Sequence, residues 1–138
     1  MSAYGVMTVN WVELRYFNVI TIEQGDPLDW GNLLADSLTS MISFLKDKSI
    51  LSRAMNTINL NKSDYKIALR SGLFNSEFPS TLARKEFVLD YECYSDDEKE
   101  IDQISGLIRV FHDEIAGLFE ASIKDGLREI IGEIKNGL

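Results

Sequence analysis

Apolar residues recur at alternating steps of three and four along the last third of the chain, which is the spacing of a buried helix face. This seam predicts a long C-terminal helix, and its members are Ile101, Ile104, Ile108, Phe111, Ile115, Leu118 and Ser122. Continuing the same steps would bury Asp125 and Glu129, whereas the apolar residues resume at Phe119. Such a phase change indicates either a stutter or a break in the helix. We expect a break near Ser122, because Ser122 and Asp125 are spaced like a new helix cap.

Five other segments carry the patterns of strands and of the loops between them. Residues 9–22 are rich in β-branched and aromatic side chains and predict a long strand. Both faces of this strand are largely apolar, so a helix or another copy of the chain must cover its second side. Residues 51–60 and 65–74 predict an antiparallel hairpin, and 75–83 predict a loop. Residues 87–94 alternate cleanly and predict a further strand.

One more helix is expected between the first strand and the hairpin. Asp26 and Pro27 suit a helix start, and an apolar stripe then runs to near Lys48. Ser95 lies three residues before Glu98, which is the spacing of a capping box for the last helix. The order strand-helix-strand-strand-strand-helix predicts an α+β fold, with about four mainly antiparallel strands and a long C-terminal helix packed across one face. We expect residues 1–138 to form a single α+β domain.

The predicted core combines the inward positions of these strands and helices. Its members are Leu14, Tyr16, Leu38, Ile42, Ile67, Leu69, Leu89, Tyr91, Ile104, Ile108, Phe111, Ile115 and Leu118. Cys93 lies in phase with Leu89 and Tyr91, so we expect a buried thiol.

Charge and cysteine content narrow the classes of function. The chain of 138 residues has a formal net charge of −8. This acidity argues against direct nucleic-acid binding, which depends on basic side chains that neutralise phosphates, and it admits binding to a basic patch on a partner protein. Cys93 is the only cysteine, so no internal disulfide can form. We expect a cytoplasmic protein that does not bind membranes, because the first ten residues lack a secretory pattern and no apolar run approaches about 20 residues.

Acidic side chains gather around the predicted start of the last helix. The candidate partner-binding residues are Asp96, Asp97, Glu98, Glu100 and Asp102. They could dock against basic residues of a partner. The structural alternative is that the helix dipole stabilises carboxylates in the first helical turn. Their order is not that of a calcium loop, and we expect no metal site.

Three other residues are candidates for chemistry or for ligand binding. His112 precedes Asp113, but adjacent helical positions point in different directions, which argues against a catalytic pair. His112 is the only histidine in the sequence, so no second histidine is present that could activate Cys93. Asn18 shares an apolar strand face, so it is either a pocket residue or a group that satisfies a strand irregularity by internal hydrogen bonds. With no phosphate loop or serine elbow in the sequence, we expect no catalytic residue, no cofactor and no enzyme.

Three segments resemble motifs of a known family. Leu14-Arg-Tyr-Phe-Asn18 resembles a Leu-Arg-Tyr-x-Asn strand, and Leu89-Asp-Tyr-Glu92 resembles a Leu-Asp-x-Asp/Glu strand. The segment from His112 resembles a closing His-x-x-Ile-x-x-x-Phe helix, although Lys124 stands where the family has threonine. The chain is thus similar to the C-terminal half of a sporadically distributed, functionally uncharacterised bacterial protein family. Its longer members are nearly twice this length, and their distribution implies mobile, phage-related or defence-related genes.

These observations together favour a non-enzymatic protein-interaction module. If longer relatives pack two halves together, a lone half would expose an apolar surface, and a homodimer would cover that surface. We expect the module to bind and mask a protein partner of unknown identity, in the setting of phage–host conflict. The alternative is a small-ligand-binding domain with a pocket between the sheet and the C-terminal helix, to which Asn18 would contribute.

Overall fold

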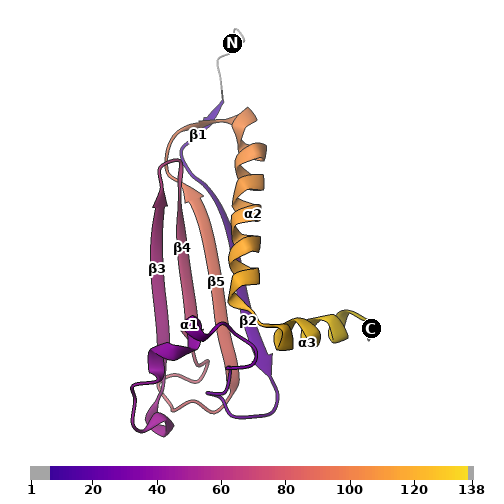
Figure 1. Cartoon of the computed structure of the whole chain (residues 1–138). Coiled ribbons are helices and arrows are strands. Elements are labelled where there is room, and N and C mark those ends of the chain that lie inside the picture. The colour runs from indigo at the N-terminus through magenta and orange to yellow at the C-terminus, as the bar shows by residue number, and fades with distance from the viewer. Residues whose placement is uncertain (1–6, 137–138) are drawn as a thin grey trace.

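The computed structural model describes residues 7–136 and shows a four-stranded antiparallel sheet crossed by a long helix (Figure 1). The strands are β1 (Thr8–Val9), β2 (Val12–Ile22), β3 (Ala54–Lys62), β4 (Tyr65–Leu73), β5 (Lys85–Ser95) and β6 (Lys99–Glu100). The α-helices are α1 (Asp36–Thr39), α2 (Ile104–Ser122) and α3 (Asp125–Asn136), and the 3-10 turns are η1 (Ser40–Ile42), η2 (Lys48–Ile50) and η3 (Ile101–Gln103). The main sheet has the order β2-β5-β4-β3, while β1 pairs with β6. The predicted α+β class, with the long helix packed against the sheet, is confirmed.

The strand predictions are confirmed with small shifts at the strand ends. β5 lies inside the sheet and pairs with β2 along its whole length, from Val12 opposite Ser95 to Ile22 opposite Lys85. β3 and β4 form the expected hairpin and are joined at residues 63–64. Gly72 of β4 has a φ of 148°, and a Cβ atom there would collide with the backbone of β3. Glycine is therefore required where these two strands approach most closely.

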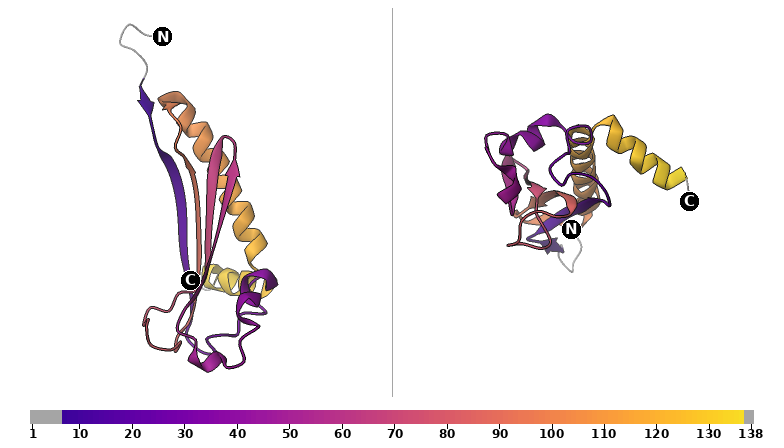
Figure 2. Two further views of the ribbon diagram at one scale, coloured as in Figure 1. Left: turned by 90° about the vertical axis from the view of Figure 1, so that its left-hand side faces the viewer. Right: turned by 90° about the horizontal axis from the view of Figure 1, so that it is seen from below.

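The C-terminal helical region breaks where its apolar pattern changes phase. α2 ends at Ser122 and α3 begins at Asp125, so the predicted break is confirmed. Ser122 does not cap α3; its hydroxyl donates to the Leu118 carbonyl at 2.6 Å. The connecting residue Ile123 forms an isolated antiparallel bridge with Leu34, from the loop after β2. This bridge turns the chain, and α3 projects sideways from the end of α2 (Figures 1 and 2).

Two predictions about helix starts are wrong. The helix expected from Pro27 to near Lys48 is reduced to α1 and short 3-10 turns. Burial of Trp30 against Phe87, with ring centroids 5.5 Å apart, holds this segment as a loop, and its many Ser, Thr and Asn residues favour local hydrogen bonds over a helix. The predicted capping box at Ser95 does not form, because β5 continues through Ser95. The capping box lies instead at Glu100, the last residue of β6.

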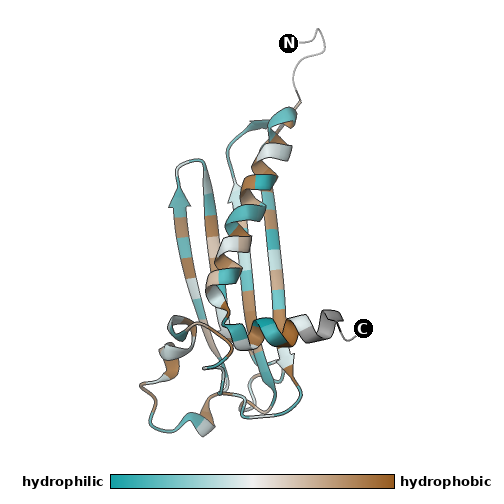
Figure 3. Cartoon of the chain, turned by 45° about the vertical axis from the view of Figure 1, so that its right-hand side comes forward, coloured by the Kyte–Doolittle hydropathy of each residue, from teal (hydrophilic) through white to brown (hydrophobic). Residues whose placement is uncertain are grey.

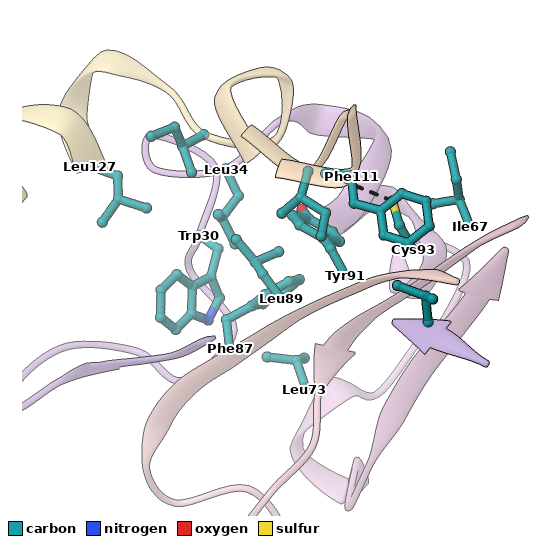
Figure 4. Close-up of a cluster of buried hydrophobic side chains, with 13 residues drawn as sticks. Trp30, Leu34, Ile67, Leu73, Phe87, Leu89, Tyr91, Cys93, Phe111 and Leu127 are labelled. Carbon is teal, nitrogen blue, oxygen red and sulfur yellow. Dashed lines mark hydrogen bonds between the residues drawn. The ribbon is translucent and has the colours of Figure 1, made fainter. Parts of the chain in front are cut away.

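The core lies between the sheet and α2 (Figures 3 and 4). Predicted members such as Phe111, Ile115 and Leu89 are fully buried. Tyr16 is a wrong prediction, because it lies on an edge strand and is 39% exposed. The fully buried residues absent from the predicted core include large side chains: Trp30, Leu34, Phe87 and Leu127. They fill the end of the core where the loop after β2 meets α3, and tertiary contacts such as the bridge at Leu34 bring these segments together.

Candidate functional site

The two faces of the main sheet differ in what covers them. α2 packs against β2 and β5 on one side, here called the covered face. On the opposite side, the open face, Phe17 is 55% exposed and Val19 is 49% exposed. The end-on view in Figure 2 shows the α2 helix lying to one side of the strands. Within the part of the chain that the structure describes, no helix covers the open face, so the second apolar side of β2 faces outward.

A network of ion pairs crosses the centre of the open face. The Asp90 carboxylate is only 2% exposed and accepts hydrogen bonds from Arg15 Nε at 2.8 Å and Nη2 at 2.7 Å. Arg70 Nη1 donates to the same carboxylate at 3.4 Å. The hydrogen bonds to Asp90 raise the pKa of Arg15. Because β2, β5 and β4 each contribute one of these groups, the network joins three strands side by side.

A pair of carboxylates, Glu13 and Glu92, lies beside this network. Glu92 of β5 has its pKa raised, first by a hydrogen bond with Glu13 of β2 and then by burial. Arg70 Nη2 lies 3.6 Å from Glu92 and opposes this effect. The open face thus holds two arginines among three carboxylates. The β2–β5 register places Arg15 opposite Glu92, and the β4–β5 register places Arg70 opposite Asp90.

An aromatic pair and the acidic turn meet at one end of the open face. Trp11 is 53% exposed and stacks on Tyr94, with centroids 5.0 Å apart and rings 16° from parallel. Asp96 follows β5 directly and forms an ion pair with Lys66 Nζ at 2.8 Å, which lowers the pKa of Asp96. We call Trp11, Tyr94, Asp96, Asp97 and Glu98 the aromatic–acidic surface.

The structure places all five predicted acidic residues at the connection from β5 to α2. Asp96, Asp97 and Glu98 are exposed in the turn before β6. Glu100 and Asp102 are exposed at η3, where the backbone N–H of Glu100 donates to Gln103 Oε1 at 2.9 Å. Glu100 therefore has the structural role of a helix cap, while Asp96 is bound to Lys66, which lies opposite Tyr94 in the sheet.

A groove runs along α2 on the covered face. It has a volume of about 160 Å³, and its lining includes Ile58, Leu69, Ser71, Tyr91, Leu118 and Ser122. The hydroxyls of Tyr91 and Ser122 are hydrogen-bonded to each other beneath it, and burial raises the pKa of Tyr91. The predicted pocket residue Asn18 does not line this groove. Its side-chain Nδ2 instead donates to the Leu89 carbonyl at 3.5 Å.

The two residues considered for catalysis, Cys93 and His112, differ in exposure. Cys93 is fully buried under α2, and burial raises the pKa of its thiol to about 11. His112 is exposed on α2 and lies edge-on to Tyr16, with centroids 6.1 Å apart. Within residues 7–136, no three His, Cys, Asp or Glu side chains are grouped so that they could hold a metal ion. None of the helices described is both long and apolar enough to cross a bilayer.

Sequence reasoning missed Trp11 and the arginine pair on Asp90. Within the predicted strand 9–22 nothing in the pattern distinguishes Trp11, which lies just before β2 and is exposed, from the other apolar residues. The arginines are separated by more than fifty residues, and only the register of β4 and β5 brings Arg70 to Asp90. The comparisons with protein families, curated proteins and solved structures found no match. The family resemblance therefore stays a prediction.

Proposed function

We propose that this chain is a non-enzymatic protein-interaction module that works as a homodimer and binds and masks a partner protein. The observation that carries the proposal is the aromatic–acidic surface, where Trp11 is stacked on Tyr94 and half exposed beside Asp96. Tryptophan and tyrosine are the residues that most often dominate binding energy at protein interfaces. An ordered, exposed tryptophan with no role in the core is therefore best explained by a partner.

The acidic turn gives the expected partner a chemical character. Asp96, Asp97 and Glu98 are exposed and follow Tyr94 closely along the chain, and the whole chain carries a net charge of −8. Such a surface complements a basic patch that also offers an apolar pocket for an indole ring. Masking of that basic patch would be the mechanism. The phage–host setting rests on the family resemblance alone.

The high pKa of Cys93 supports a function without covalent catalysis. A thiol with a pKa of about 11 is almost wholly protonated at neutral pH, and only the thiolate is a good nucleophile. Cys93 is also fully buried, so a substrate could not reach its sulfur without opening the core.

Capture from the native host, followed by measured affinities, tests the proposal. Proteins retained by the wild-type chain would be identified by mass spectrometry and the partner purified for calorimetry. Trp11→Ala should weaken binding at least tenfold, because hot-spot residues cost about 2 kcal/mol or more. Phe44→Ala, which truncates a 79% exposed aromatic elsewhere, is the matched control and should bind normally. Equal affinities for the two variants would contradict the assignment of the surface.

Charge reversal separates the electrostatic contribution from the aromatic one. Lysine substitution at Asp96, Asp97 and Glu98 should weaken binding and flatten its dependence on salt. Lysine substitution at Glu23, Asp29 and Asp113 changes the net charge equally at exposed positions elsewhere. An unchanged affinity in the first triple variant would remove the basic-patch partner while leaving the aromatic contact standing.

The groove beside α2 supports a second candidate, the binding of a small apolar ligand. Its volume of about 160 Å³ is below the roughly 300–1,000 Å³ of typical ligand pockets. This groove therefore offers room for only a small molecule. This difference in size is why we place protein binding first.

A further inference from the structure

The edge strand β3 lacks the protection that natural sheets give their edges. β3 pairs with β4 on one side only. In the left view of Figure 2 the β3–β4 hairpin comes toward the viewer, and none of the described helices lies in front of it. Edge strands are usually shielded by charged residues, proline, bulges or a covering segment. β3 has no proline, and Lys62 at its end is its only charged residue.

The other edge, β2, carries the charged residues that β3 lacks. It holds Glu13 and Arg15, and Arg15 is bound to Asp90. In Figure 1, α3 extends sideways beyond β2 near the C-terminal end of that strand. The two edges of one sheet therefore differ in charge, and β3 is the edge better suited to pairing.

We propose that two copies of the chain pair antiparallel along β3 about a two-fold axis at Ile58, forming one continuous eight-stranded sheet. The proposal rests on the homodimer of the proposed function and names its interface. In this register Ile58 lies opposite the partner's Ile58, and Thr57 lies opposite the partner's Asn59. Ala54 lies opposite the partner's Lys62, so all nine residues of β3 pair.

Charge explains why a second copy fits this strand. Two chains that each carry a net charge of −8 repel one another over most of their surfaces. In the β3 pairing no like charges lie opposite each other, because Lys62 faces Ala54 of the other copy and is itself bound to Glu114 at 2.9 Å. At the centre of the strand, Ile58 would meet an apolar partner and Thr57 a polar one, while like charges opposite each other, which are destabilising, are avoided. The strand can therefore pair with itself without the repulsion that the rest of this acidic molecule would cause.

The dimer would also extend the groove on the covered face. In one chain that groove is lined by Leu118 and Ser122 of α2, by Leu38 of α1 and by Ile58 of β3. α2 packs on β2 and β5, which leaves Ile58 and Leu60 of β3 exposed. After pairing, both copies of β3 and β4 would form a shared apolar floor between the two α2 helices.

Light scattering on eluted protein and a disulfide trap test the interface together. The wild-type chain should elute as a dimer between about 1 and 100 μM. Ile58→Lys places two lysines opposite each other and should weaken dimerisation at least tenfold. Val19→Lys alters an equally exposed β-branched residue on the other edge strand and should remain dimeric. Far-UV circular dichroism shows whether each variant is folded.

Cysteine trapping keeps the test decisive if Ile58→Lys does not fold. Ile58→Cys should form a covalent dimer on mild oxidation, because the two-fold axis places the two thiols opposite each other, whereas Val19→Cys should not. The native Cys93 is fully buried and will not interfere. If Ile58→Lys remains dimeric and Ile58→Cys forms no covalent dimer, the β3 interface is overturned, although the chain is still a homodimer. A wild-type monomer at 100 μM would overturn both, while partner binding through Trp11 would still be tested separately.

Discussion

The same strands build a covered face and an open face by different physics. On β5, Leu89, Tyr91 and Cys93 point under α2 and are buried with Phe111. The intervening Asp90 is buried just as completely, but by two arginines instead of a helix. Apolar burial is non-directional and tolerates small shifts, whereas the ion pairs require one register. The contrast indicates that the covered face supplies most of the stability and the open face fixes how the strands align.

Removing a large side chain from the covered face should have the greatest effect. Phe111→Ala deletes a fully buried ring from beneath α2 and should lower the free energy of unfolding by about 3–5 kcal/mol. Urea denaturation followed by circular dichroism measures this loss. Val110→Ala, at the next helical position and 44% exposed, should cost less than about 0.5 kcal/mol. A loss below about 1 kcal/mol in Phe111→Ala would show that α2 contributes little to the core.

Neutralising the centre of the open face should have an intermediate effect. Asp90→Asn keeps the shape of the side chain but removes the charge that both arginines share, and it should cost about 2 kcal/mol. The arginines are partly exposed, so the cost stays below that of breaking a fully buried pair. A double-mutant cycle with Arg15→Gln measures the coupling. Additive losses would mean that the Arg15–Asp90 contact does not contribute to alignment.

The smallest effect is expected at the acidic pair, and it depends on pH. The hydrogen bond with Glu13 and burial raise the pKa of Glu92 in the folded state, so the native chain holds a proton that the unfolded chain has released. This contribution to stability is complete below the ordinary carboxyl pKa and is lost as pH rises through the raised value. Glutamine cannot release a proton, so Glu92→Gln should remove this pH-dependent loss of stability. It should stabilise the protein at pH 7 by less than about 1 kcal/mol.

Urea midpoints of the wild type and Glu92→Gln, measured between about pH 4 and pH 7, test this dependence. The lower limit lies near the ordinary carboxyl pKa. Glu98→Gln also removes one negative charge but lies in the exposed acidic turn, so it controls for the change in net charge. If both variants follow the wild-type slope, the Glu13–Glu92 contact has no energetic consequence.

The sequence predicted the periodic elements and missed what depends on tertiary contacts. The break after Ser122 was readable because an apolar phase change is a local signal. The helix expected after Pro27 failed because burial of Trp30 against Phe87 overrides local preference. In the candidate site, the acidic turn was visible as a cluster in the sequence. The neighbouring Trp11–Tyr94 stack was not, because it exists only once β2 and β5 are in register.

The bridge between Leu34 and Ile123 has a consequence for the order of folding. It joins a segment from the first third of the chain to one near its end, and the Lys124 N–H donates to the Leu33 carbonyl at 2.8 Å beside it. Contacts between such distant segments form slowly, because a long stretch of chain must first be brought together. A ribosome would have to extend the chain past Ile123 before the segment around Trp30 and Leu34 could close. That corner therefore forms only after α2 has been synthesised.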